Sequence, residues 1–106
     1  MKTNMTGHAI NDRITRFEYI IDTVGIGKVV TRYQDIDEYN RIVIFELTTT
    51  GVIIVRNKDN MVVTAYIAEL RQAIRVWRCS NGDKKMPAPL FTKIKQNDIA
   101  RINQPC

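Results

Sequence analysis

The chain has 106 residues, of which 44% are hydrophobic and 25% are charged, and it carries a net charge of +5. This length suits one domain with one core, and the composition is that of a globular protein rather than a disordered one. No apolar run reaches the roughly 20 residues that a membrane-spanning helix needs, and residues 1–10 lack the apolar stretch of a signal peptide, so a cytoplasmic location is expected.

The first predicted element is a helix over residues 6–24. Its apolar residues recur at spacings of three and four, which makes one stripe on a helix: Ile10, Ile14, Phe17, Ile21 and Val24. Thr6 can cap its start, and the glycines at 25 and 27 end it.

Four β-rich runs follow, at residues 28–33, 41–48, 51–57 and 61–68. The acidic segment 34–40 is predicted to be a turn, and residues 58–60 a short hairpin loop. Because the connections are too short for parallel crossovers, the strands must pair antiparallel.

Two helices are predicted after the sheet, at residues 69–78 and 90–102. Residues 80–85 are expected to form a loop, and the prolines at 87 and 89 to keep residues 86–89 extended. The expected fold is therefore α+β: an N-terminal helix packed on a four-stranded antiparallel sheet, followed by two C-terminal helices. One domain spans 1–106, with a core at 6–78 and a basic C-terminal extension at 79–106.

The charge is concentrated in the last 40 residues. Residues 1–66 hold eight Lys and Arg and eight acids, whereas residues 67–106 hold eight Lys and Arg and three acids. A basic stretch attracts phosphate backbones or an acidic protein partner, and it is equally consistent with a solvated surface. The residues expected to contact nucleic acid are Arg32, Arg71, Arg75, Arg78, Lys84 and Lys85.

Alternation of side chains along the strands suggests a polar face on the sheet. Val43, Phe45 and Leu47 are expected to join Met61, Val63, Ala65 and Ile67 in the core beneath the N-terminal helix. The opposite face then gathers Glu46, Arg56, Thr64 and Tyr66, with Arg32 close by. Arginine binds phosphate and hydroxyls relay protons, although Thr, Tyr and Arg are also common on a plain solvent face.

Other chemistries find little support. His8 is the only histidine in the sequence. It could act in acid–base catalysis near neutral pH, or it could be an ordinary surface residue. Cys79 and Cys106 have no zinc-type spacing and are expected to be free thiols. No metal or cofactor is expected, since no phosphate-binding glycine motif occurs either.

The pair His8-Ala9, the arginines at 13 and 16, and the segment GVIIVRNKDNMVVTAYIA at residues 51–68 resemble the barnase–EndoU–colicin–RelE group of small ribonucleases, including toxin and phage-encoded forms. The resemblance implies a metal-independent endoribonuclease that activates a ribose 2′-OH against the adjacent phosphate. It assigns catalysis to His8, Arg13, Arg56, Thr64 and Tyr66, with RNA as substrate and an acidic antitoxin or immunity protein as a further partner. Arg13 follows His8 by five residues rather than the four typical of the group, which places it about 140° around a helix.

A second hypothesis is a non-catalytic module of phage or mobile-element origin that binds nucleic acid or protein through its basic C-terminal segment. Trp77, between Arg75 and Arg78, could stack on a base or be buried in the core. A third hypothesis is an assembly protein that oligomerises through a sheet edge.

Overall fold

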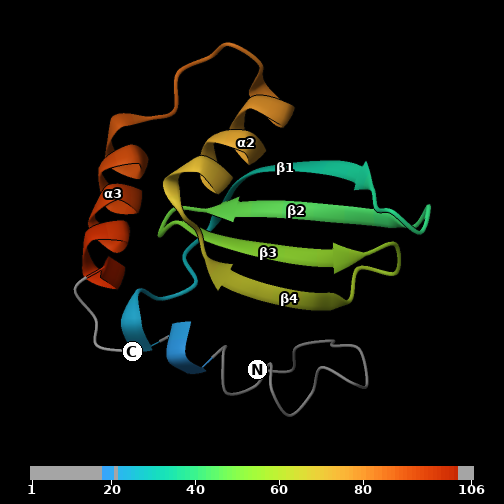
Figure 1. Cartoon of the computed structure of the whole chain (residues 1–106), viewed down its shortest axis with the longest axis horizontal. Coiled ribbons are helices and arrows are strands. Elements are labelled where there is room, and N and C mark those ends of the chain that lie inside the picture. Colours follow the sequence, from blue (N-terminus) through green and yellow to red (C-terminus); the bar gives the residue numbers. More distant parts are fainter. Residues whose placement is uncertain (1–17, 21, 103–106) are drawn as a thin grey trace.

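The computed structural model describes residues 18–20 and 22–102, and within them it shows an antiparallel sheet with two helices (Figure 1). The elements follow the chain as β1 (Val29–Ile36), β2 (Ile42–Thr48), β3 (Val52–Asn57), β4 (Val62–Ile67), α2 (Leu70–Asn81) and α3 (Ala88–Ile102). The sheet order is β1-β2-β3-β4, and every neighbouring pair is antiparallel. The predicted α+β class, the four-stranded antiparallel sheet and both C-terminal helices are thus confirmed.

The predicted N-terminal helix is described only at its end. Residues 18–20 and 22–23 are helical, while residues 6–17 and 21 lie outside the described residues. Ile20 is buried at 1% exposure and packs with Val52, Ile54 and Ala65. This end of the segment therefore covers one face of β3 and β4.

The boundaries of three other elements differ from those predicted. β1 continues to Ile36, through part of the expected turn, because Gln34, Asp35 and Ile36 still pair with β2. α2 runs on to Asn81, beyond the predicted end. α3 begins at Ala88, two residues before the predicted start, so residues 88 and 89 are helical rather than extended. Pro89 is tolerated there because the first turn of a helix leaves its N–H groups without a partner within the helix, and proline has no N–H to leave unpaired.

Strand β3 is buried on both faces of the sheet, whereas the edge strand β1 is largely exposed. The face that we call the helix face carries Leu47, Ile53 and Val55, against which α2 packs Ala73 and Val76 and α3 packs Leu90 and Ile94. The opposite face carries Val52, Ile54, Val62 and Ala65 under Ile20. Because β3 and β4 bury apolar residues on this face as well, the face is not the wholly polar one that the strand pattern predicted.

α3 lies beside the tight connection between β2 and β3 (Figure 1). Asn97, which is 7% exposed, donates a hydrogen bond from Nδ2 to the carbonyl of Thr50 at 2.9 Å. Gly51 follows at a positive φ of 81°, with Ile94 and Asn97 directly against it. The helix is thereby fixed to the end of the sheet.

Candidate nucleic-acid interface

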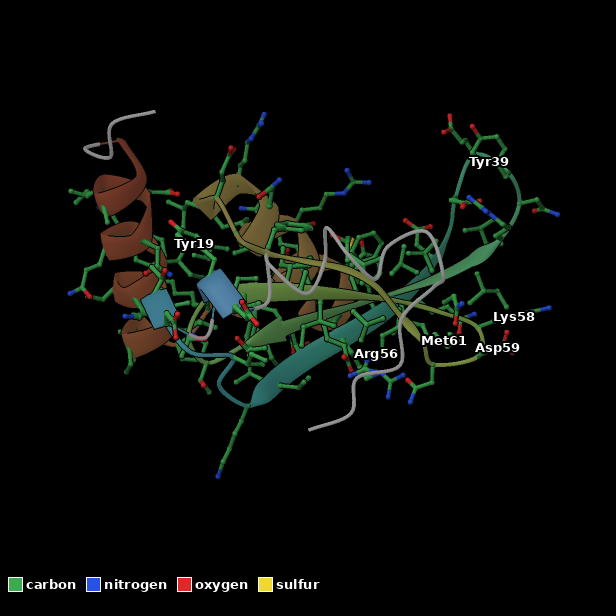
Figure 2. The ribbon with its side chains drawn as sticks, turned by 90° about the horizontal axis from the view of Figure 1, so that it is seen from below. Tyr19, Tyr39, Arg56, Lys58, Asp59 and Met61 are labelled. Atoms are coloured by element: carbon green, nitrogen blue, oxygen red, sulfur yellow. The ribbon has the colours of Figure 1, made fainter. Side chains whose placement is uncertain are left out.

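Arg56 is engaged in an ion pair on the opposite face of the sheet. Its Nε donates to Oε1 of Glu46 at 2.7 Å, and its Nη1 donates to the carbonyl of Asn60 at 3.0 Å. Figure 2 shows Arg56 near the β3–β4 hairpin, with Lys58, Asp59 and Met61. Because Glu46 is 8% exposed, this arginine neutralises a desolvated carboxylate, which is a structural task.

Thr64 and Tyr66 lie on the helix face, away from Arg56. Thr64 pairs with Val55 and Tyr66 with Ile53, whereas Glu46 pairs with Ile54 and Arg32 with Glu46. The prediction that Glu46, Arg56, Thr64 and Tyr66 share one face is therefore wrong. Arg32 and Glu46 do share a face with Arg56, as predicted.

The prediction was wrong because it assigned the apolar residues of β2 and those of β4 to the same face of the sheet. Val43, Phe45 and Leu47 pack toward α2, while Ala65 and Ile67 pack toward Ile20. A register shift between Val55 and Arg56 also lets Val63 join the helix face alongside Thr64. His8 and Arg13, the remaining predicted catalytic residues, lie outside the described residues.

The arginines of α2 form a stripe on its exposed side. Arg71, Arg75 and Arg78 are all exposed, and their spacing places them within about 60° of one another around the helix. Arg71 pairs with Glu69 at 2.8 Å. Within the part of the chain that the structure describes, neither Arg75 nor Arg78 is paired with a carboxylate.

The start of α2 is secured by two side chains. The N–H of Glu69 donates to Oε1 of Gln72 at 2.8 Å, and the N–H of Leu70 donates to Oδ2 of Asp98 in α3 at 3.1 Å. These bonds satisfy N–H groups at the helix start, and Asp98 also places a negative charge there.

The far end of α2 stops at Gly82, whose φ is 63° and whose N–H donates to the carbonyl of Arg78 at 2.8 Å. A helix held at both ends presents its arginine stripe in a fixed geometry.

The loop after α2 adds two more cations. Lys84 and Lys85 are exposed, and the carbonyl of Lys84 accepts a hydrogen bond from Nε1 of Trp77 at 2.6 Å. That bond holds the loop against the last turns of α2. The loop lysines and Arg78 therefore belong to one basic surface, which continues from the arginine stripe.

Aromatic side chains on the helix face lie next to this surface. The rings of Tyr33 and Phe45 stack with centroids 5.2 Å apart and planes at 14°. Partial burial and the neighbouring Cys79 raise the pKa of Tyr33, while Arg75 opposes the rise. No sequence pattern indicated this stack, because it depends on which residues of β1 and β2 face each other across the pair.

Tyr66 lines a cleft of about 480 Å³ between the helical residues near 20, the end of β4, and α3. Lys93, Gln96 and Tyr19 also line it. Burial raises the pKa of Tyr66, with Arg75 acting in the other direction, so the phenol stays protonated and can donate a hydrogen bond at neutral pH. Lys93 is a cation in this cleft that no sequence pattern pointed to.

Among residues 18–20 and 22–102, no group of three His, Cys, Asp or Glu is placed to hold a metal ion, and no helix there is long and apolar enough to cross a membrane. Cys79 is an exposed free thiol. Comparison with known proteins found no matching family model, no similar curated protein and no similar solved structure.

Proposed function

We propose that this protein binds a nucleic acid, with RNA as the first choice, through the exposed face of α2 and the loop that follows it. The observation that carries the proposal is that the twelve residues of α2 contain three exposed arginines and no acid. Arg75 and Arg78 carry charge that no described carboxylate neutralises, and Lys84 and Lys85 extend it. Such a surface suits a phosphate backbone, which arginine binds with two parallel hydrogen bonds.

The proposal includes a cytoplasmic location, where nucleic acid is abundant and where an exposed thiol such as Cys79 stays reduced. An acidic antitoxin or immunity protein would compete for the same cations. A nucleic-acid strand is favoured over such a protein as the ligand, because the arginine stripe is narrow and linear, like the phosphate backbone that it would follow.

Binding is tested by fluorescence anisotropy of a labelled 12-nucleotide oligo(U) over a series of salt concentrations. The double variant Arg75→Gln/Arg78→Gln should weaken binding at least tenfold and reduce the salt slope by about 0.7 for each phosphate that the two arginines no longer neutralise. The matched control is Lys28→Gln/Lys58→Gln, which removes the same charge from exposed positions outside α2 and should retain most of the affinity. Equal losses of affinity in the two variants would reduce the effect to net charge alone and overturn the assignment to α2.

A second candidate function is metal-independent RNA cleavage of the toxin or phage type, as the sequence resemblance implies. It is supported by Tyr66, which lies in the 480 Å³ cleft with Lys93 and shares the helix face with Thr64. A protonated tyrosine can donate a proton or a hydrogen bond to a phosphate, and a lysine can offset its charge.

Cleavage is tested with labelled RNA in EDTA, comparing the wild type with Tyr66→Phe, His8→Ala and Arg56→Gln. Cleavage that is abolished in the first two variants would support the assignments of Tyr66 and His8, whereas its absence in the folded Arg56→Gln variant would restore a catalytic role to Arg56. If the folded wild-type protein binds several RNAs and cleaves none of them, the cleavage function is excluded and the protein is a binding module.

A further inference from the structure

The last turns of α2, the loop after it and the start of α3 enclose a cleft of about 420 Å³. Figure 1 shows this loop arching from the end of α2 to the start of α3. The volume falls within the range of about 300–1,000 Å³ that is usual for small-ligand sites.

The cleft combines an apolar wall with a cationic rim. Trp77 and Phe91 supply two aromatic rings, and Ile74 and Met86 supply aliphatic contact. Arg78, Lys84 and Lys85 supply three cations, and Asp83 is the one acid among the described residues that line the cleft. A ligand that matches both parts must be flat and apolar in one portion and anionic in the next.

Trp77 is held in position before any ligand arrives. Its indole N–H donates to the carbonyl of Lys84 at 2.6 Å, so its orientation is tied to the loop. Phe91 keeps 37% of its surface exposed and has the Lys95 ammonium 5.6 Å from its ring centroid. Ordered rings cost less entropy to bind against than mobile ones.

We propose that this cleft receives one unpaired base of a single-stranded nucleic acid, stacked on Trp77 or Phe91, while Arg78, Lys84 and Lys85 bind the flanking phosphates. The inference rests on the proposed function and adds to it that the strand is single. In a duplex the bases are stacked on each other and their faces are closed to a protein ring, whereas every unpaired base offers such a face. The cationic rim favours a nucleotide over an apolar peptide segment.

Trp77 is the only tryptophan in the chain, which makes its fluorescence a direct report on the cleft. The experiment titrates the wild type with an 8-nucleotide oligo(U) and with an abasic oligomer of the same length, following Trp77 fluorescence and the anisotropy of an end label together. We expect both oligomers to bind and only the one with bases to quench Trp77. Phe91→Leu should weaken oligo(U) by roughly 5- to 100-fold and leave the abasic oligomer unchanged.

Tyr39→Leu is the matched control, since Tyr39 is 69% exposed on the β1–β2 hairpin and should have no effect. Saturating oligo(U) binding with no change in Trp77 fluorescence would overturn the base site and leave the basic surface in place. Failure of both oligomers to bind would overturn the proposed function itself, so the two failures are distinguishable.

Discussion

Gly51 allows α3 to pack closely on the β2–β3 connection, because it has no side chain. Its φ is 81°, and a Cβ there would lie 3.0 Å from both Asn97 Nδ2 and Ile94 Cγ1. Gly25 has a similar φ of 73° but nothing within 4 Å of its Cβ position. Gly25→Ala should therefore cost about 1 kcal/mol of backbone strain, and Gly51→Ala about 2–4 kcal/mol because crowding adds to the strain.

Urea denaturation followed by Trp77 fluorescence measures both losses of stability. Equal costs at Gly25 and Gly51 would contradict the close packing of α3 on the β2–β3 connection.

Arg56 is predicted to serve stability rather than recognition. Arg56→Met leaves the carboxylate of Glu46 desolvated without its 2.7 Å partner, which should cost about 2–4 kcal/mol. The double variant Glu46→Gln/Arg56→Met should be less destabilised than the sum of the single variants, because the pair acts as a unit. Urea midpoints test the stability. A loss of oligo(U) affinity in the folded single variant would show that Arg56 also contacts the ligand.

At the scale of elements, the attachment of α2 to α3 depends on Asp98. Its Oδ2 accepts the N–H of Leu70 at the first position of α2. Asp98→Ala should cost about 1 kcal/mol and accelerate amide exchange at Leu70, while Asp98→Asn should retain the acceptor and most of the stability. Hydrogen exchange resolved by residue provides the measurement. Unchanged exchange at Leu70 in the alanine variant would exclude this role.

The elements differ in how well the sequence predicts them. α2 was predictable because Leu70, Ile74 and Trp77 recur at helical spacing. The same helical period places Arg71, Arg75 and Arg78 together on another side. β3 was predictable as a strand, but its residues 52–55 are all apolar, so alternation could not show which of them face α2.

Features that depend on the register between strands could not be predicted from the sequence either. The bulge near Val63 interrupts the alternation of side chains along β4. The stacking of Tyr33 on Phe45 can be predicted only when the pairing of β1 with β2 is known. The predicted polar face is split because Thr64 pairs with Val55 and Tyr66 with Ile53, which places both on the helix face, whereas Glu46 and Arg56 lie on the opposite face.

At the scale of the whole molecule, the tyrosines of the helix face couple stability to alkaline pH. Burial raises the pKa of Tyr66 above its ordinary value near 10, and burial together with Cys79 does the same for Tyr33. Above pH 10 the unfolded chain therefore releases phenol protons that the folded chain retains. Stability contributed by these groups is complete below pH 10 and is lost as the pH rises through the raised values.

Removing one phenol should reduce that loss of stability. Relative to the wild type, Tyr66→Phe should show a smaller drop in the urea midpoint between pH 9 and pH 11, and Tyr33→Phe/Tyr66→Phe a smaller drop still. Arg75→Gln should act in the opposite direction, because Arg75 holds down the pKa of both tyrosines and its removal widens their separation from the unfolded values. Tyr39→Phe, on the exposed hairpin, is the control. Parallel curves for Tyr66→Phe and the wild type would mean that the Tyr66 phenol titrates alike in the folded and unfolded chain, and that α2 and the cleft do not shield it from water.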